Sequence, residues 1–383
     1  MDLKERVEEI EGFIRYVMVE WPQVRAGVAG ELAPRCTRCV LSDRATTLHN
    51  GVCAACRAAD AAPAADRTRD HEALARELDA VLKDHAGKGR GRYDAVVLFS
   101  GGKDSAYLLH RLIAEHPGLR LLAATIDNGF FSAIAMANVR RILERIDVDH
   151  VTVKPKASLY KHTFQHALTH LNAGGCYTTV DRMDGDLAFD TGRNLAASLD
   201  IPLMIAGLSP EQVGRVLGLQ TFESPQEQEC ARRTESAGFV LDDLYRGEDR
   251  KAWWDGSAWP AERVPRVLYP FFAWPYDEQH IRSEVVRLGL IAEGADNPLA
   301  TNNDTIPVML AVDVNVMGYS GFEPEFADLV RTGRAAREFW LPLFESLEYL
   351  GKRGQFLPKC VDDTLGRLGL TRRDVGIPEA QGV

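Results

Sequence analysis

The fold of this chain is decided by the stretch Ala95-Val96-Val97-Leu98-Phe99-Ser100-Gly101-Gly102-Lys103-Asp104-Ser105. It opens with a short, continuously apolar run, which is the pattern of a β-strand buried on both faces. The two glycines then allow the backbone to turn sharply, and a helix is predicted from about Asp104 to His116. A buried strand that runs into a helix through a glycine turn is typical of an α/β domain.

The chain on either side of this stretch alternates in the same way. Further strands are predicted at 121–126, 150–153 and 202–206, and a helix is predicted over 136–146. Strands that alternate with helices of this length indicate a parallel, doubly wound sheet. In such sheets the ligand binds beyond the carboxyl ends of the strands.

Four segments are expected along the 383 residues. They are an N-terminal helix over 1–30, a cysteine ribbon with a linker over 31–66, the α/β domain over 67–276 and a mostly helical C-terminal region over 277–383. The linker is predicted from the small residues and the proline of 58–66, and an amphipathic helix is predicted over 71–82. The polar, tryptophan-containing stretch around Trp253 and Trp254 is predicted to be a mobile lid.

The glycine turn has the composition of an anion site. The backbone N–H groups of Gly101 and Gly102 can approach an anion closely, and the hydroxyl of Ser105 falls in the first helical turn. Lys103 adds a positive charge, and the helix dipole favours a phosphate at the same place. The spacing excludes the loop of the common ATPases and GTPases, which needs a longer gap between its glycines. The alternative interpretation is a glycine turn that binds no ligand.

The run from Ser100 to Ser105 resembles the loop of the PP-loop ATP pyrophosphatases, which release pyrophosphate while attaching AMP to an acceptor. The resemblance implies an α/β domain of the HUP type. It also implies that the pyrophosphate is held by Ser100, Gly101, Gly102, Lys103, Asp104 and Ser105, with Lys103 and Asp104 in catalytic roles.

The same resemblance assigns further positions around the nucleotide. Ile126 and Asp127, at the end of the second predicted strand, would lie beside the adenosine, where Asp127 would orient the ribose or a Mg²⁺ ion. A plain turn at 127–129 is the alternative. Gly207 follows the fourth predicted strand, and Glu211 on the next helix is a candidate Mg²⁺ ligand or else a solvated helix carboxylate. Arg193 is either a contact of ATP or the acceptor, or a surface arginine.

Four cysteines form two knuckles with metal-ligand spacing: Cys36, Cys39, Cys53 and Cys56. Two C-x-x-C turns can close a tetrahedral Zn²⁺ site, and four thiolates around the ion leave no open position for chemistry. We therefore expect structural zinc, with an iron–sulfur cluster as the main alternative.

The cysteine ribbon followed by the loop resembles the N-acetyl sugar amidotransferase family over roughly residues 30–210, on the segments 36–40, 51–57, 93–94 and 100–105. Shorter matches occur at 269–271, 276–278 and 297–299. The resemblance implies a small-molecule or sugar acceptor and ammonia from a glutaminase partner. One departure is the region 174–179, which keeps a single cysteine, Cys176, where a pair is expected.

Nitrogen and sulfur transfer remain open at this point. Sulfur transfer needs a reactive thiolate, and outside the ribbon the chain offers Cys176, Cys230 and Cys360. Cys176 follows two glycines in a predicted loop and is the best candidate, although a buried bystander thiol is the alternative. Nitrogen transfer needs no cysteine and is favoured by the resemblance. A non-catalytic nucleotide-binding protein is a further alternative.

Composition limits the partners and the compartment. The formal net charge is −10, which disfavours tRNA because nucleic-acid binding needs a basic surface. The N-terminus is charged from its second residue, and no apolar stretch is long enough for a membrane span, so we expect a cytoplasmic enzyme. The C-terminal region is expected to shape the acceptor pocket or a homodimer contact.

Overall fold

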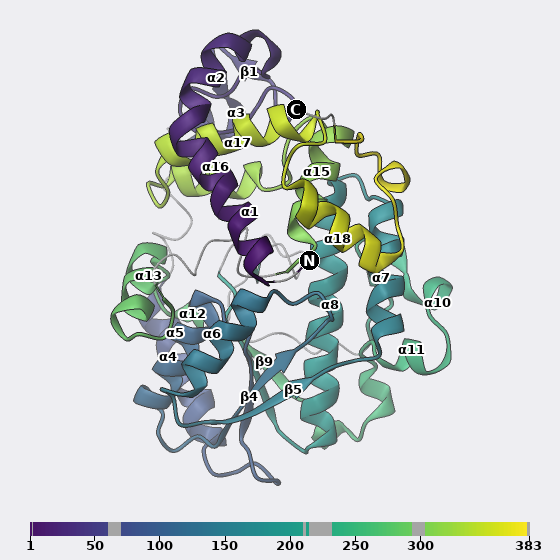
Figure 1. The fold of residues 1–383 in the computed structure, drawn as a ribbon. Helices are drawn as coiled ribbons and strands as arrows, with labels where there is room; N and C mark the ends of the chain where they lie inside the picture. Colours follow the sequence, from purple (N-terminus) through teal and green to yellow (C-terminus); the bar gives the residue numbers. More distant parts are fainter. Residues whose placement is uncertain (2, 60–69, 210–211, 214–231, 293–302, 381–383) are drawn as a thin grey trace. The chain divides into compact units, whose positions relative to one another are not determined.

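The structure is a computed structural model that describes residues 1, 3–59, 70–209, 212–213, 232–292 and 303–380. The chain divides into two compact units (Figure 1). Unit 1 comprises 1–69, 161–181 and 303–383, and unit 2 comprises 70–160 and 182–302. These units do not coincide with the four segments expected from the sequence, because unit 1 joins both ends of the chain with a piece of its middle.

Unit 2 is built on a five-stranded sheet with the order β5-β4-β3-β6-β9. Every neighbouring pair is parallel. The strands are β3 (Ala95–Leu98), β4 (Leu121–Ile126), β5 (Asp149–Val153), β6 (Leu203–Ala206) and β9 (Arg266–Leu268). The parallel, doubly wound sheet predicted from the sequence is confirmed, and the first four strands lie where they were predicted. The edge strand β9 was not predicted.

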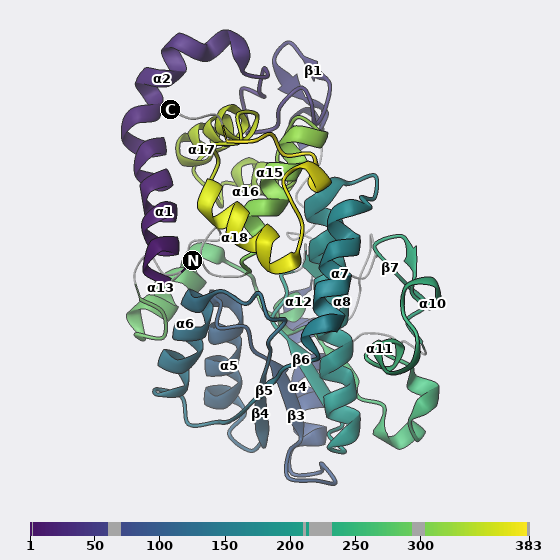
Figure 2. The ribbon, with the colours of Figure 1, turned by 45° about the vertical axis from the view of Figure 1, so that its right-hand side comes forward.

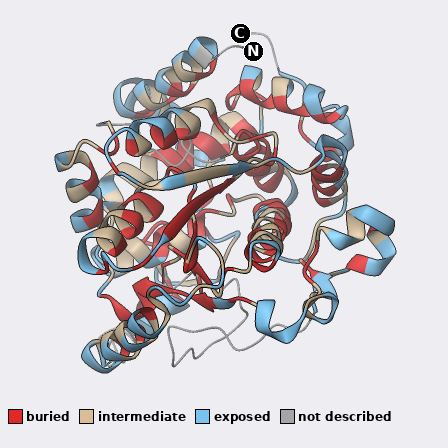
Figure 3. Cartoon of the chain, turned by 90° about the horizontal axis from the view of Figure 1, so that it is seen from below, coloured by how far each residue is buried: buried red, intermediate tan, exposed pale blue. Residues whose placement is uncertain are grey.

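Helices cover both faces of this sheet. In both views α5 (Lys103–Glu115) and α6 (Ala133–Leu143) lie on one side, and the part of α8 (Gly175–Ser198) that belongs to unit 2 lies on the other (Figures 1 and 2). Every residue of β6 is buried, as are Ala95, Val96 and Val97 of β3. Figure 3 shows the buried strands between the helices. Burial on both faces explains why these strands are continuously apolar.

Unit 2 contains further helices and two short strands. They are α4 (His71–His85), β7 (Glu235–Ser236), β8 (Phe239–Val240), α10 (Leu241–Leu244), α11 (Gly247–Lys251), α12 (Pro270–Ala273) and α13 (Glu278–Arg287). Helix α4 confirms the amphipathic helix predicted over 71–82, since Leu74, Leu78 and Leu82 are buried at helical spacing. Its first turn is capped by Asp70, whose carboxylate accepts the N–H of Ala73 at 2.9 Å.

The strand order reverses at β3, which pairs with β4 on one side and β6 on the other. Leu98, the last residue of β3, is level with Ala124 of β4 and with Ala206, the last residue of β6. The chain segments that leave β3 and β6 therefore start at the same level of the sheet. In doubly wound sheets this reversal point is where ligands bind.

Unit 1 is mostly helical. Its elements are α1 (Leu3–Arg15), the π-helical turn Tyr16–Glu20, α2 (Trp21–Val28), β1 (Leu48–His49), β2 (Val52–Cys53), α3 (Ala54–Ala59), α15 (Ile306–Val316), α16 (Glu323–Arg331), α17 (Arg337–Gly351) and α18 (Pro358–Leu368), with most of α7 (Ala157–Thr169) and the start of α8. The predicted N-terminal helix is confirmed. Among the described residues, no helix is both long and apolar enough to cross a membrane.

The N-terminal helices pack on the C-terminal ones. Phe13 meets Phe356 edge to face at 5.1 Å between ring centroids, and the Trp21 ring lies 5.5 Å from that of Tyr349. The Glu9 carboxylate accepts the N–H of Cys360 at 2.8 Å in the first turn of α18. These contacts explain why residues 1–30 belong to the same unit as the C-terminal region.

Candidate functional site

The loop between β3 and α5 is organised around the Ser105 hydroxyl. This hydroxyl donates to the carbonyl of Gly102 at 3.1 Å and accepts the N–H of Ser100 at 3.3 Å. The N-cap of α5 is Gly102, which has no side chain to satisfy the N–H groups of the first turn. The helix therefore presents these donors, together with its positive dipole end, at the reversal point of the sheet, as an anion site requires.

Two glycines of the site are closely surrounded by neighbouring atoms. Gly101 has φ +72°, and a Cβ there would lie 2.7 Å from both the carbonyl oxygen of Ala135 and Cγ2 of Val139, in helix α6. At Gly207, just after β6, a Cβ would lie 3.2 Å from Leu108 and 3.4 Å from Phe271. Both predicted glycine positions are thus at tight points of unit 2, directly beyond the strand ends.

Lys103 and Asp104 take part in a polar cluster with Tyr276, a residue far away in the sequence. The Lys103 ammonium lies 2.8 Å from Oδ2 of Asp104 and 3.4 Å from the Tyr276 hydroxyl, and that hydroxyl donates to Oδ1 of Asp104 at 2.9 Å. Glu278 adds a second carboxylate at 3.8 Å from the ammonium. Burial lowers the pKa of Lys103, but the attraction of Asp104 and its neighbours outweighs burial and raises it. The ammonium is therefore charged at neutral pH.

The carboxylate of Asp127 forms a turn directly after β4. Its Oδ1 accepts the N–H of Gly129 at 2.8 Å, and its Oδ2 pairs with the Lys154 ammonium at 2.7 Å. The structure thus shows the turn that the sequence offered as one interpretation. Ile126, the last residue of β4, precedes it. A role of Ile126 and Asp127 toward adenosine or Mg²⁺ stays a prediction.

One polar contact beside this turn was missed from the sequence. The amide Nδ2 of Asn128 donates to both carboxylate oxygens of Asp184, at 3.0 and 3.1 Å. The contact joins the end of β4 to helix α8 within unit 2. No sequence pattern predicts this hydrogen bond, because the two residues lie 56 positions apart.

Cys176 lies in the first turn of α8 and not in a loop, which corrects the sequence-based expectation. Gly175, with φ +92°, starts the helix, and the backbone N–H of Cys176 donates to Oδ1 of Asp313 at 2.5 Å. The thiol is fully buried, and burial, reinforced by the Asp313 carboxylate, raises the pKa of Cys176 well above its usual value. Cys176 belongs to unit 1, whereas the loop at Ser100–Ser105 belongs to unit 2.

Arg193 is buried, so the surface alternative for this residue is wrong. Its guanidinium donates to Oδ1 of Asp190 at 2.7 Å, and Arg233 donates to both oxygens of the same carboxylate at 2.7 and 3.0 Å. The backbone N–H of Trp254 also donates to Asp190, at 3.0 Å, and the Trp253 ring is buried as well. The segment predicted to be a mobile lid is therefore packed in this structure, with both tryptophan rings buried and the Trp254 N–H bound to Asp190 of α8.

We expect Asp190→Asn to destabilise unit 2 strongly. The substitution removes the buried negative charge that Arg193 and Arg233 share, although Arg233 keeps its ion pair with Asp186 at 3.1 Å. Breaking a buried pair costs about 3–5 kcal/mol. Urea unfolding of the variant measures this loss. Asp242→Asn is the control, because Asp242 forms ion pairs with Arg232 and Arg250 on an exposed surface and should change stability far less. Equal stability losses in both variants would contradict the account of the Asp190 network.

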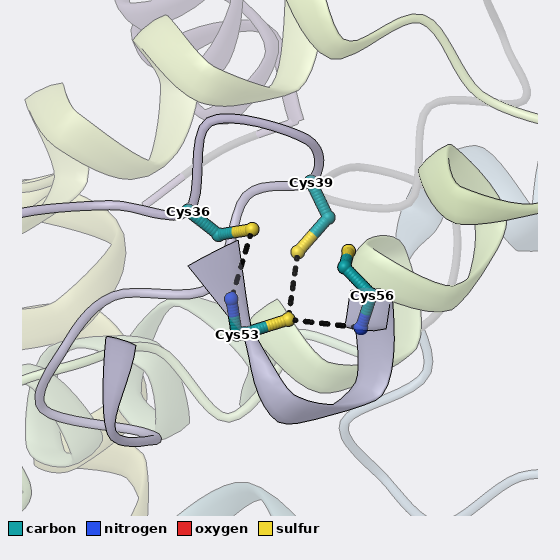
Figure 4. Close-up of side chains that lie close together, drawn as sticks. All are labelled: Cys36, Cys39, Cys53 and Cys56. Carbon is teal, nitrogen blue, oxygen red and sulfur yellow. Dashed lines mark hydrogen bonds between the residues drawn. The ribbon is translucent and has the colours of Figure 1, made fainter. Parts of the chain in front are cut away.

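The cysteine ribbon has its four thiols gathered in unit 1 (Figure 4). All four are buried, and their sulfur atoms lie within 4.8 Å of one another. The second knuckle follows a hairpin whose two turn residues, Asn50 and Gly51, both have positive φ, as a tight type I′ turn requires.

Backbone N–H groups of Cys53 and Arg38 donate to Sγ of Cys36 at 3.4 and 3.5 Å. Burial opposes ionisation of this thiol, but these N–H groups outweigh it and lower the pKa of Cys36 to about 6.

One sulfur–sulfur distance in the ribbon can be compared with that of a tetrahedral metal site. With Zn–S bonds of about 2.3 Å, the sulfurs of a tetrahedral site stand about 3.8 Å apart. Sγ of Cys39 and Sγ of Cys53 are 3.7 Å apart. A cubane cluster binds each thiolate to a different iron and would hold the sulfurs farther apart. The structure therefore shows a four-thiol site that could hold a metal ion, and zinc as its occupant stays a prediction.

Arginine side chains form hydrogen bonds and ion pairs between the ribbon and the C-terminal helices α16 and α17. Arg337 of α17 donates to the carbonyls of Cys39 and Cys36 at 2.8 and 3.0 Å, and Arg331 of α16 donates to Sγ of Cys56 at 3.6 Å. Arg35, buried beside the first knuckle, pairs with Glu323 and Glu348 at 2.9 and 3.0 Å. Such outer contacts orient metal ligands and offset the negative charge of a four-thiolate site.

Glu211, the candidate Mg²⁺ ligand, and Cys230 lie outside the described residues. Cys360, the other thiol considered for sulfur transfer, is buried in α18, and burial together with Glu9 raises its pKa. The structure thus gathers the residues from Ser100 to Ser105 with Gly207 in unit 2, and the four ribbon cysteines in unit 1.

Comparison with known proteins identifies no family for this chain. No family model and no curated protein matches the chain. Solved structures with similarity include NMN synthetase from Francisella tularensis (TM-score 0.35, 13% identity, 76% of this chain and 96% of that chain). Others are the U34-tRNA thiolase NcsA from Methanococcus maripaludis with its 4Fe–4S cluster (0.36, 13%, 92% and 95%) and the NH3-dependent NAD synthetase from Campylobacter jejuni (0.33, 12%, 74% and 96%). With TM-scores this low, these similarities carry no argument about function.

Proposed function

We propose that this chain is an ATP-dependent, AMP-forming enzyme of the PP-loop class that adenylates an acceptor oxygen and then transfers nitrogen to the acceptor. The observation that carries the proposal is the loop from Ser100 to Ser105, which presents the uncapped start of α5 at the reversal point of a parallel sheet. The proposed acceptor is a small molecule or a sugar, in line with the resemblance of the ribbon and loop to N-acetyl sugar amidotransferases.

The chemistry follows from the charges of the site. An acceptor oxygen attacks the α-phosphorus of ATP, the bond between that phosphorus and the bridging oxygen breaks, and pyrophosphate leaves. The N–H groups at the start of α5, with Lys103 nearby, stabilise the negative charge that develops on the departing pyrophosphate. Ammonia then attacks the activated carbon of the acceptor, AMP leaves with the oxygen, and the nitrogen loses a proton to solvent.

Nitrogen transfer is favoured over sulfur transfer by the state of Cys176. A sulfur carrier has to form a thiolate and reach its reaction partner. The Cys176 thiol is fully buried, and its pKa is raised by burial and by Asp313. A glutaminase subunit is the proposed source of ammonia, and free ammonium should replace it in vitro.

The test is a product assay with ATP, Mg²⁺, ¹⁵N-ammonium and a panel of carboxylate- and carboxamide-bearing sugars. We expect AMP and pyrophosphate in equal amounts, together with ¹⁵N in the acceptor. ADP and phosphate as products would overturn the proposed reaction. Sulfur incorporation from a persulfide donor, with no ¹⁵N incorporation, would replace nitrogen transfer with thiolation.

Cys176→Ala separates the two transfers independently. For nitrogen transfer we expect the rate of AMP formation with ammonium to stay within about twofold of wild type, because no covalent step uses the thiol. The rate is measured by coupled detection of pyrophosphate, with Cys360→Ala as the control for loss of a buried thiol in unit 1. A complete loss of turnover in Cys176→Ala alone would contradict nitrogen transfer.

A further inference from the structure

The segment after β9 returns to the nucleotide loop within unit 2. It runs through α12 to Tyr276, whose ring packs edge to face on Phe271 with 5.4 Å between centroids. Phe271 in turn lies over Gly207, where a Cβ would come within 3.4 Å of its ring. Because β9 is parallel to β6, this segment leaves the sheet at the same edge as the loop. Packing thus fixes the position of the Tyr276 hydroxyl beside Asp104.

Asp104 presents a problem for an anion site. It lies in the first turn of α5, where a carboxylate is attracted to the free N–H groups and to the positive end of the helix dipole. A carboxylate bound there would occupy the position that a phosphate needs. Its two oxygens are instead engaged elsewhere, Oδ1 by the Tyr276 hydroxyl at 2.9 Å and Oδ2 by the Lys103 ammonium at 2.8 Å.

We propose that Tyr276 is a positioning residue for nucleotide binding, which holds the Asp104 carboxylate off the start of α5 and so keeps the loop open to pyrophosphate. This inference rests on the proposed function, since it assigns a role toward ATP. Burial and the neighbouring Asp104 raise the pKa of Tyr276, so the phenol keeps its proton and remains a donor. Lys103 and Asp104 are each about four-fifths buried, at 17% and 21% exposure, which strengthens the contacts between them.

The test is calorimetric titration of the full-length protein with Mg·ATP, pyrophosphate and AMP. Tyr276→Phe keeps the ring and its packing on Phe271 and removes only the hydroxyl. Because the Asp104 carboxylate then loses the donor that holds it away from the start of α5, we expect the Kd for ATP and for pyrophosphate to rise by about tenfold or more. The Kd for AMP, which lacks the pyrophosphate, should be unchanged.

Tyr107→Phe is the matched control. Tyr107 also packs on Phe271, with 6.2 Å between ring centroids. Among the described residues, no side-chain hydrogen bond joins Tyr107 to the loop from Ser100 to Ser105. This variant should bind all three ligands as wild type does. The inference is overturned if Tyr276→Phe binds ATP as tightly as wild type, or if it loses ATP and AMP equally, as a general loss of structure would cause. If wild type itself binds neither ATP nor pyrophosphate, the proposed function fails, and the inference fails with it.

Discussion

Gly101→Ala is expected to abolish ATP binding and to destabilise unit 2. The new Cβ would lie 2.7 Å from the carbonyl oxygen of Ala135 and from Cγ2 of Val139, and the backbone at this position has φ +72°. Alanine at a positive φ costs more than the about 1 kcal/mol that a compatible substitution gains. Because a backbone carbonyl cannot move aside cheaply, the loop has to shift away from α6. Its N–H groups then no longer converge on the pyrophosphate.

The measurement combines ATP titration with urea unfolding. Gly185→Ala is the matched control, since Gly185 lies within α8 in unit 2 and an added Cβ would meet nothing within 4 Å. In a helix this control should stabilise the protein by up to about 1 kcal/mol. Wild-type ATP affinity in Gly101→Ala would show that the geometry of this loop does not decide nucleotide binding.

The second large effect is expected from loss of the metal. We predict about one zinc ion per chain, and its removal by a chelator, or the substitution Cys39→Ser, should unfold the ribbon and loosen its contacts with α16 and α17. The free energy lost is on the order of several kcal/mol, because structural zinc sites contribute directly to folding. The buried pairs that Arg35 forms with Glu323 and Glu348 would then be exposed to water.

This prediction is tested by elemental analysis, by the visible absorption spectrum and by thermal melting. Cys360→Ala serves as the control, because Cys360 is a buried thiol of unit 1 outside the ribbon and should keep the zinc. Iron with acid-labile sulfide in place of zinc would contradict the tetrahedral interpretation of the sulfur spacing. A variant Cys39→Ser that melts at the wild-type temperature would contradict a structural role for the metal.

Local patterns in the sequence predict the part of the fold that holds the loop. Strands such as β3 and β4 are apolar on both faces, so composition alone identifies them. The edge strand β9 has only three residues and begins with the exposed Arg266, which is too short for any periodicity. The glycines before Cys176 suggest a loop, whereas the structure uses Gly175 at positive φ to begin a long helix.

The candidate site can be predicted only in part, because some of its contacts join residues that lie far apart in the sequence. Its loop is local, so the residues from Ser100 to Ser105 can be identified from their own order. The contact of Tyr276 with Asp104 spans 172 positions and depends on how β9 is placed beside β6. Helix α8 shows the opposite problem, since two of its charged residues are buried although their sequence suggests exposure. Asp190 and Arg193 look like surface residues because charged side chains are seldom fully buried unless they are paired.

Displacement of bound ATP by pyrophosphate tests the central claim most directly. If the loop at Ser100–Ser105 holds the pyrophosphate part of ATP, inorganic pyrophosphate should displace Mg·ATP from the wild-type protein completely and competitively. AMP should do so only at much higher concentration. ATP that binds but is not displaced by pyrophosphate would contradict the account, because the nucleotide would then be held at a place other than this loop.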